Sequence, residues 1–302
     1  MSYHIISIDT PDCCISVRKG QLIASSHGVT NSVPLEDVAS IVITSFKCTI
    51  SNNLLIHAAK FKIPIIICEY FIPISILLPA DRATDTQIIR NLAKLTPQHK
   101  RRLWKKTIDA KCHNQLILAS KWSPHHPLIE GMQRIVASDK ESKEAECAKC
   151  YWTVFSDSFA NGHFRRDKKL EDFNVLFNYA YAILLSCILR YLLALGLDPT
   201  FGIFHVPRAH AAPLAYDLME PFRPLFDAKI AHWINFNNIS SQATSTPLIT
   251  KEYKQFISST LTDTILYDNK QLPLKQAIEQ MVRSFRASVY SLQVGTYVPW
   301  KT

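Results

Sequence analysis

Glycine is scarce in this chain, which has only 7 glycines and 16 prolines among its 302 residues. Long flexible linkers are typically rich in glycine or proline, so we do not expect such linkers here. The sequence also contains no G-x-x-x-x-G-K-[ST], G-x-G-x-x-G, G-x-S-x-G or H-E-x-x-H motif. These absences disfavour nucleotide hydrolases, dehydrogenases and zinc proteases.

A secretory leader and an uninterrupted membrane-spanning run are also missing. The first residues, M-S-Y-H-I-I-S-I-D-T, contain no basic stretch followed by a long apolar core. The most apolar segment, 179–195, is shorter than a typical span and is interrupted by Ser186 and Arg190. We therefore expect a buried core helix at this segment, no membrane partner and a cytoplasmic protein.

The eight cysteines do not follow the spacing of a zinc finger. Cys68 and Cys187 lie in apolar runs, which is typical of reduced, buried thiols. Cys147 and Cys150 form a C-x-x-C pair, but no second pair follows and the pair lies in an expected helix. Helix packing is the simpler interpretation of this pair, and metal or redox use is the alternative.

Basic residues outnumber acidic ones by 34 to 25, which gives a net charge of +9. This balance favours an anionic partner, either nucleic acid or an anionic membrane surface. Much of the charge is clustered, and Trp104 lies inside the first cluster, where it could stack on a base or simply pack. Each cluster alone would usually be a solvated face, but several on one basic chain favour DNA. The clusters are Lys100, Arg101, Arg102, Lys105 and Lys106; Arg165, Arg166, Lys168 and Lys169; and Arg283 and Arg286.

Residues 1–80 have the pattern of a β-rich domain. Short runs rich in Ile and Val are separated by Gly, Pro, Asn and Ser, which predicts strands. One helix interrupts them, with Ser51 as its N-cap and apolar residues at helical spacing after it. The expected strands are 4–9, 14–17, 21–24, 40–44, 63–69 and 74–78.

The pattern becomes helical after a polar segment at 78–85. We expect a linker and first helix at 81–95 and a helical catalytic domain at 96–302, which gives an α+β fold with an all-α C-terminal domain. Pro97 suits the first turn of a helix, Gly196 is the expected stop of another, and Pro221 and Pro224 perturb a third. The expected helices are 86–95, 97–121, 127–137, 142–155, 172–195, 212–235, 250–259 and 273–292.

Residues 196–227 carry the most informative pattern. His205 follows a turn, and Asp217 and Glu220 lie three residues apart in an apolar segment expected to be helical, so they share one face. Carboxylates in such surroundings are costly unless they are paired or bind a metal. Glu144 lies far upstream in K-E-A-E-C-A-K-C-Y-W and would complete a metal-dependent phosphoryl-transfer centre. The alternatives are an ion pair between Glu220 and Arg223, and a surface position for Glu144.

These segments, taken together, resemble the CRISPR-associated protein one family, the universal integrase of bacterial adaptation. V-P-L-E-D-V-A-S-I-V-I at 33–43 and S-x-x-L-L-x-x-A-A-K-x-K-I-P-I-I-x-C at 51–68 are similar to its first domain. E-A-x-x-A-x-x-Y-W at 144–152, G-L-D-P-x-x-G-x-x-H at 196–205 and L-A-Y-D-L-M-E-P-F-R-P at 214–224 are similar to its catalytic motifs. The last form and V-P-L-E-D are most similar to the type II branch.

The resemblance implies a metal-dependent DNA integrase or endonuclease that inserts short spacers into a repeat array by transesterification. Its metal, Mg²⁺ or Mn²⁺, would be held by Glu144, His205 and Glu220, with Asp217 as a less certain ligand. It also implies a homodimer, a heterohexamer with a small companion adaptation protein, and DNA partners in the form of a spacer duplex and a repeat array. The RNA-guided effector nuclease is a further candidate partner. The expected DNA contacts are Arg101, Arg102, Lys105, Arg165, Arg166, Arg208 and Arg223.

Two other functions remain open at this point. In a non-catalytic DNA-binding scaffold, the same acids would only make ion pairs with Arg223 or Arg208. A general repair nuclease would share the chemistry and differ in its substrate. Dependence on metal separates the scaffold from the enzymes.

Overall fold

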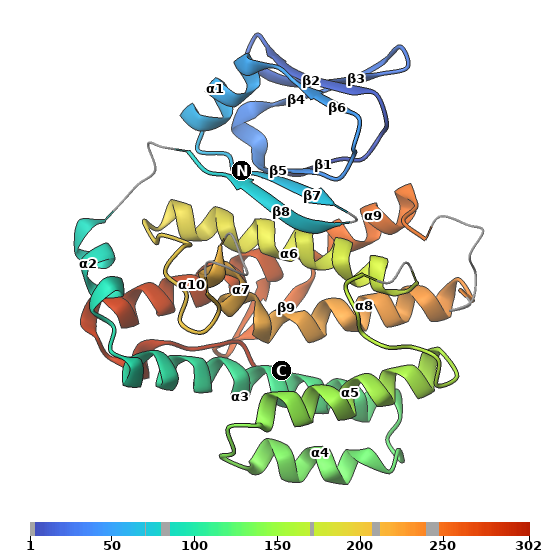
Figure 1. Ribbon diagram of the computed structural model, residues 1–302, viewed down its shortest axis with the longest axis vertical. Coiled ribbons are helices and arrows are strands. Elements are labelled where there is room, and N and C mark those ends of the chain that lie inside the picture. The colour runs from blue at the N-terminus through green and yellow to red at the C-terminus, as the bar shows by residue number, and fades with distance from the viewer. Residues whose placement is uncertain (1–3, 70, 80–84, 170–171, 207–211, 240–247) are drawn as a thin grey trace.

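The computed structural model describes residues 4–69, 71–79, 85–169, 172–206, 212–239 and 248–302. Most strands gather at the N-terminal end of the molecule, and the rest is mainly helical (Figure 1). The expected α+β class is confirmed.

Two four-stranded sheets form the N-terminal part. The first has the order β1-β5-β7-β8 and is parallel except for the last pair. The second has the order β4-β3-β2-β6, with β2 and β6 parallel. The strands are β1 His4–Ile8, β2 Cys13–Arg18, β3 Gln21–Ser26, β4 Val29–Pro34, β5 Val38–Ile43, β6 Cys48–Ile50, β7 Ile65–Glu69 and β8 Ile72–Leu77.

The first sheet separates two hydrophobic cores because successive side chains of a strand point to opposite faces. On β5, Ile41 and Ile43 join a small core with residues of the second sheet and of α1 (Asn52–Lys60). Val42, between them, joins the large core of the helical part. Both faces of β5 are therefore buried, which explains its continuous apolar run.

The helix expected after Ser51 is confirmed, and the Ser51 side chain accepts a hydrogen bond from the backbone N–H of Leu54. Two strands were missing from the sequence-based expectation, β4 and β6. β4 is polar and mostly exposed at a sheet edge, and β6 has only three residues. Neither therefore shows the apolar run or alternation that predicts a strand.

Helices make up most of the chain after residue 85. Their observed bounds agree with the expected ones to within a few residues, except that the expected helix 212–235 is divided in two. They are α2 Thr86–Lys94, α3 Pro97–Trp122, α4 Leu128–Ala137, α5 Lys143–Phe159, α6 Asn174–Ala194, α7 Pro213–Met219, α8 Arg223–Phe236, α9 Lys251–Ser259 and α10 Leu274–Ser291.

The helix α6 is the centre of this part of the molecule. It contacts β5, β8 and β1 on one side and α7, α8, α9 and α10 on others (Figure 1). Its length and mean hydropathy of 1.6 would suit a membrane span, but 83% of that window is buried inside the protein. The expected core helix is confirmed, and Gly196 ends it with a φ of +71°.

The expectation of an all-α C-terminal domain is wrong in one respect. A hairpin of β9 (Thr264–Tyr267) and β10 (Lys270–Pro273) lies between α9 and α10. Asp268 and Asn269 form its turn with φ values of +48° and +62°, a conformation that Asp and Asn tolerate better than most residues. The boundaries at 80, 81 and 95 stay predictions, and residues 80–84 of the expected linker lie outside the described residues.

Candidate active site

Glu220 lies at a break between two helices. α7 ends at Met219, a single 3₁₀ turn covers Glu220–Phe222, and α8 begins at Arg223. Pro221 and Pro224 cannot donate the backbone hydrogen bonds that would continue α7, so the chain tightens there. The side chain of Asn114 on α3 donates to the carbonyl oxygen of Pro221 at 2.9 Å and fixes this turn against α3.

Glu144 and Lys111 come from two neighbouring helices that pack on this turn. Glu144 lies in the first turn of α5, where a carboxylate interacts favourably with the helix dipole. Lys111 lies on α3 between Ala110 and Cys112, on the buried face that also carries Leu103 and Thr107. The spacing of 103, 107 and 111 places all three side chains on one side of α3.

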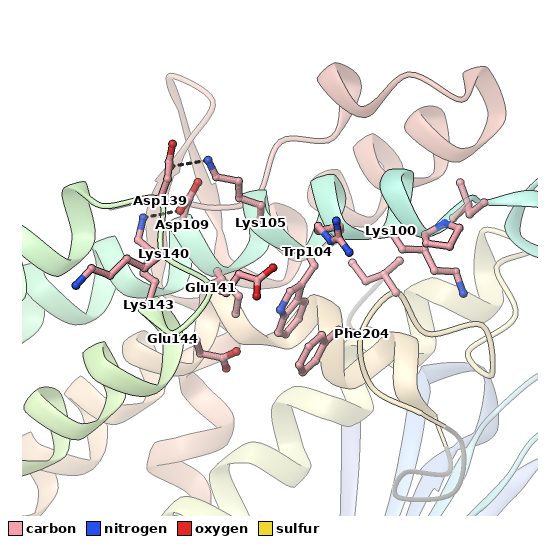
Figure 2. Close-up of a pocket in the computed structure, with 15 residues that line it drawn as sticks. Lys100, Trp104, Lys105, Asp109, Asp139, Lys140, Glu141, Lys143, Glu144 and Phe204 are labelled. Carbon is pink, nitrogen blue, oxygen red and sulfur yellow. Dashed lines mark hydrogen bonds and ion pairs between the residues drawn. The ribbon is translucent and has the colours of Figure 1, made fainter.

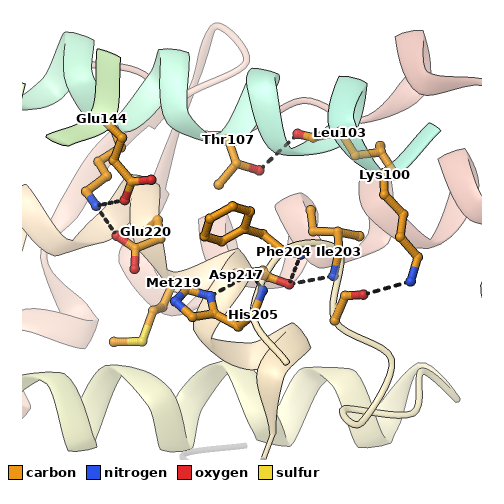
Figure 3. Close-up of polar contacts among 12 residues, drawn as sticks. Lys100, Leu103, Thr107, Glu144, Ile203, Phe204, His205, Asp217, Met219 and Glu220 are labelled. Carbon is orange, nitrogen blue, oxygen red and sulfur yellow. Dashed lines mark hydrogen bonds and ion pairs between the residues drawn. The ribbon is translucent and has the colours of Figure 1, made fainter. Parts of the chain in front are cut away.

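The two glutamates converge on the ammonium of Lys111. Its Nζ lies 2.7 Å from Oε1 of Glu144 and 2.7 Å from Oε2 of Glu220 (Figure 3). Arg223 pairs with the other oxygen of Glu220 at 3.1 Å. Only 4% of the Glu220 side chain and 11% of the Lys111 side chain are exposed, whereas 30% of the Glu144 side chain is exposed, so water reaches this cluster from the Glu144 side.

Burial and neighbouring charges oppose each other in the pKa values of this cluster. Burial raises the pKa of Glu220, but Arg223 and Lys111 outweigh it and lower that pKa to about 2. Burial lowers the pKa of Lys111, but Glu220 and Glu144 outweigh it and raise that pKa. Glu220 is therefore ionised at neutral pH, and the lysine is charged.

His205 is held by a turn that closes around Asp217. The carboxylate of Asp217 accepts hydrogen bonds from the backbone N–H groups of Ile203, Phe204 and His205 at 2.6, 3.1 and 3.1 Å. Its Oδ1 also lies 2.7 Å from Nδ1 of His205 (Figure 3). Both oxygens of Asp217 thus accept hydrogen bonds in a fully buried position, an arrangement that orients the imidazole. The role of Asp217 as a metal ligand stays a prediction.

Gly202 is required by this turn. A β-carbon at Gly202 would lie 2.3 Å from the carbonyl oxygen of His205, 2.8 Å from Cβ of Pro213 and 3.2 Å from Oδ2 of Asp217. No side chain fits at such distances without a shift of the backbone. The spacing G-x-x-H in the sequence is explained by this close approach.

Aromatic side chains surround the His205 ring. Trp104 and Phe204 contact it edge-on with ring centroids 5.8 and 5.6 Å away, and they stack on each other at 4.3 Å with parallel rings. Tyr216 lies 6.1 Å away on α7. The imidazole is close enough to Glu220 to contribute to lowering the pKa of that carboxyl group. His205 therefore belongs to the same site as the glutamates.

Another buried acid, Asp227 of α8, joins the helices that pack around the site. It accepts hydrogen bonds from the hydroxyl groups of Tyr151 and Tyr181 at 2.8 and 2.5 Å. The guanidinium of Arg223 lies over the Tyr181 ring, 4.7 Å from its centroid. Asp227 thereby links α5, α6 and α8 beside Glu220. Burial raises the pKa of Asp227 to about 6, although the tyrosine hydroxyls act in the opposite direction.

A groove of about 870 Å³ opens beside Glu144 (Figure 2). Trp104, Phe204 and Glu144 lie along it, and its basic residues include Arg101 and Lys105, two of the expected DNA contacts. Lys105 pairs with exposed Asp139 at 2.6 Å, so part of its charge is neutralised. The other basic residues that line the groove are Lys100, Lys140 and Lys143.

The remaining expected DNA contacts lie elsewhere. Arg102 is exposed on α3 but does not line the groove, and Arg165 is exposed in the loop before α6. Arg166 donates hydrogen bonds to Asn174 and Asn178 at 2.6 and 2.9 Å, so it ties that loop to α6. Arg223 has the structural ion pair described above, and Arg208 lies outside the described residues.

The structure thus brings Glu144, Glu220 and His205 into one site and places Asp217 behind His205. Within the ranges that the structure describes, no three His, Cys, Asp or Glu side chains form a ready-made metal cluster. The ammonium of Lys111 lies between the two glutamates. Lys111, Asp227 and Gly202 were not among the expected site residues, although Lys111 falls on the apolar face that helical spacing predicts for α3.

Comparison with known protein families agrees with this architecture. Residues 6–258 match the family model of CRISPR associated protein Cas1. A CRISPR-associated endonuclease Cas1 from Neisseria meningitidis serogroup C (strain 8013) is 29% identical over 283 residues, which cover 91% of this chain and 88% of the relative. Another from Korarchaeum cryptofilum (strain OPF8) is 24% identical over 337 aligned residues and covers 99% and 98% of the two chains.

Solved structures share the same fold at lower identity. A casposase bound to integration product superposes with a TM-score of 0.77 at 19% identity and covers 97% of this chain and 91% of that one. A CAS1 protein from Thermotoga maritima gives a TM-score of 0.75 at 12% identity, and the match covers 95% of this chain and 97% of that one. With the family match over residues 6–258, these likenesses lead to one conclusion: the chain belongs to the CRISPR associated protein Cas1 family.

Proposed function

We propose that this protein is a metal-dependent DNA integrase and endonuclease of CRISPR adaptation. Its relatives are named as CRISPR-associated endonucleases, and one structural neighbour is a casposase bound to integration product, which supports the proposal. The observation that carries it is the convergence of Glu144 and Glu220 on a single cation, the ammonium of Lys111. A pair of buried carboxylates arranged around one positive charge suits a divalent ion.

The residues of the site fit Mg²⁺ or Mn²⁺. The ammonium of Lys111 is a stand-in for the ion, and Oε2 of Glu220 is buried without a hydrogen-bond donor although Nζ lies close to it. Glu144, Glu220 and His205 would hold the metal, and the imidazole shifts the preference toward Mn²⁺. When bound, the metal would supply Lewis-acid activation of the phosphate and stabilisation of the leaving oxygen.

In the proposed reaction, the 3′-hydroxyl of a captured DNA fragment attacks a phosphodiester at the edge of a repeat. One phosphodiester bond forms while another breaks, so no nucleotide is hydrolysed; water in place of the hydroxyl gives nuclease cleavage. Asp217 fixes the imidazole through Nδ1, which assigns Nε2 as the nitrogen directed at the reacting groups. Arg101 and Lys105 hold the DNA backbone in the groove beside Glu144.

We also propose the partners that the family implies. The chain would act as a homodimer within a heterohexamer that contains a small companion adaptation protein and holds spacer and repeat DNA. A neighbouring structure described as a Cas6-RT-Cas1--Cas2 complex, with a TM-score of 0.81 at 18% identity over 99% of this chain and 36% of that one, supports a companion protein. Eight free cysteines are consistent with action in the cytoplasm.

A non-catalytic DNA-binding scaffold is the second candidate, and one observation favours it. Glu220 makes the ion pair with Arg223 that a purely structural carboxylate would make, and Lys111 adds another. Under this alternative, the buried charges only stabilise the contact between α3, α5 and the 3₁₀ turn.

Strand transfer separates the two functions. The substrate is a branched DNA that mimics the integrated product, because running the exchange backwards uses the same active site. We expect rejoining with Mn²⁺ or Mg²⁺, none with chelator, and a loss of at least about a hundredfold in Glu220→Ala because a carboxylate ligand is removed. The matched control is Glu146→Ala, a half-buried glutamate on the same helix as Glu144 that takes no part in the cluster around Lys111.

Wild-type activity in Glu220→Ala, or equal activity with and without chelator, would refute the metal site. DNA binding without any strand exchange in either metal would favour the scaffold, or a requirement for the companion protein. Adding that protein to the same assay distinguishes these two outcomes.

A further inference from the structure

Lys111 is an unusual neighbour for a metal site. Its Nζ is 2.7 Å from one oxygen of each glutamate that we assign to the metal, and it makes a hydrogen bond to Glu144. The lysine side chain reaches this place from the buried face of α3. A charged group in such a position is costly unless each charge has a partner.

The charges around Lys111 balance. Two cations, Lys111 and Arg223, lie against two carboxylates, Glu144 and Glu220. A divalent ion that binds both carboxylates would neutralise them by itself. The buried ammonium would then be an excess positive charge beside the metal, and the two cations would repel each other.

The distances also place the lysine where a metal shared by these two oxygens would lie. Metal–oxygen bonds to Mg²⁺ or Ca²⁺ are about 2.0–2.6 Å long. An ion bonded to the same oxygens that Nζ approaches at 2.7 Å would lie in contact with the ammonium. One of the two cations must move, and the flexible four-carbon stem of lysine is the part that can.

We propose that Lys111 is an exchangeable internal counter-ion, which holds Glu144 and Glu220 together until a divalent metal displaces its ammonium. The inference rests on the proposed function, because it concerns the same metal site. It assigns Lys111 a positioning role with two effects. Lys111 keeps the glutamates oriented before the metal binds, and it weakens the affinity for metal because it must be displaced.

Calorimetric titration of the DNA-free protein with Mn²⁺ tests this exchange. We expect Lys111→Met to bind Mn²⁺ at least about tenfold more tightly than wild type, since no ammonium competes for the carboxylates. The metal-free variant should unfold at a lower temperature than wild type, and saturating Mn²⁺ should raise that temperature by more than it does in wild type. Lys121→Met removes the same charge from an exposed position on α3 that does not line the groove, and it should leave the affinity unchanged.

Equal or weaker Mn²⁺ binding by folded Lys111→Met would overturn the inference. If Lys111→Met does not fold, Lys111→Gln replaces it, because the amide can still donate hydrogen bonds to the glutamates but carries no charge. If neither variant folds, amine-reactive labelling of wild type decides. Labelling of Lys111 that increases at saturating Mn²⁺ supports exchange, and unchanged protection overturns it.

The outcome for Glu220→Ala separates this inference from the proposed function. If wild type fails to bind Mn²⁺, or Glu220→Ala binds it as well as wild type does, the metal site itself is wrong. If Mn²⁺ binds through Glu220 but Lys111→Met gains no affinity, only the role of Lys111 is wrong.

Discussion

Gly202 has no β-carbon, and the position of His205 depends on that absence. The nearest atoms to a β-carbon at Gly202 would be the carbonyl oxygen of His205 and Cβ of Pro213, both closer than 3.0 Å. Any side chain at Gly202 must therefore displace the turn that Asp217 holds through three backbone N–H groups.

Gly202→Ala should accordingly reduce strand transfer by about 10–100-fold, which is the usual cost of disturbing a group that orients a metal ligand. Overpacking should also lower the free energy of unfolding by about 1–3 kcal/mol. Strand-transfer rates and thermal unfolding measure the two effects. Gly131→Ala in α4 is the control, because nothing lies within 4 Å of its β-carbon position and it should be neutral or slightly stabilising. Wild-type activity in Gly202→Ala would show that the turn can relax.

At this scale, the sequence predicted the acids and the histidine but not their neighbours. The motifs that contain Glu144, His205 and Glu220 are local, and the structure places the three residues in one site. The part played by Lys111 depends on which helix packs beside α3, and no local pattern contains that information. The hydrogen bonds of Asp217 likewise required the path of the 202–205 turn.

Helices α5, α6 and α8 meet at the buried carboxyl group of Asp227. Its pKa is about 6 in the folded protein, raised by burial, whereas the ordinary value is 3.8. Between these values the folded state binds more protons than the unfolded state, so the free energy of unfolding falls as pH rises from about 4 to 6. Two pKa units correspond to about 3 kcal/mol, which is an upper bound for this change.

Asp227→Asn should remove this pH dependence, because the amide cannot titrate. The free energy of unfolding can be measured with denaturant from pH 4 to 7. As pH rises, the value for wild type should fall relative to the value for Asp227→Asn. Asp268→Asn, in the exposed turn between β9 and β10, should show no such trend. A difference between wild type and Asp227→Asn that is constant across this range would contradict the raised pKa.

At the scale of elements, the long helices were predictable because their apolar spacing is repeated over many residues. The break at Glu220–Phe222 was indicated by Pro221 and Pro224. The hairpin of β9 and β10 was missed because only four residues form each strand and both strands are partly exposed. Asp268 and Asn269 were the available signal, since Asp and Asn tolerate the positive φ of a tight hairpin turn.

The whole molecule carries a net charge of +9, and its DNA affinity should depend on salt accordingly. Arg101 lines the groove and Arg165 is exposed in the loop before α6. Replacing both with Ala should make the slope of log affinity against log salt shallower by about 2, because each phosphate contact contributes about 1. Replacing Arg18 of β2 and Lys60 of α1 with Ala removes the same charge from two other exposed positions and is the control. An unchanged slope in the double variant would place the DNA elsewhere.

The α+β class of the fold was predictable from the sequence. The packing of the N-terminal sheet against the helical part was not. A change from alternating to helical spacing marks the end of the β-rich region. The sequence pattern did not indicate that Val42, Ile66 and Cys68 belong to the same core as α6. That core crosses the expected boundary, and an ion pair between Asp9 and Lys254 of α9 crosses it as well.

This arrangement of α6 has a consequence for how the protein is made. On the ribosome, the strands that cover one side of α6 emerge before it, whereas α7, α8, α9 and α10 emerge after it. For that interval the nascent chain exposes an apolar helix long enough to enter a bilayer. We therefore expect chaperones to bind the nascent chain during this interval, before the later helices cover α6. A fragment that begins after the expected linker would keep α6 but lose its strand-side cover, and should aggregate where the intact chain does not.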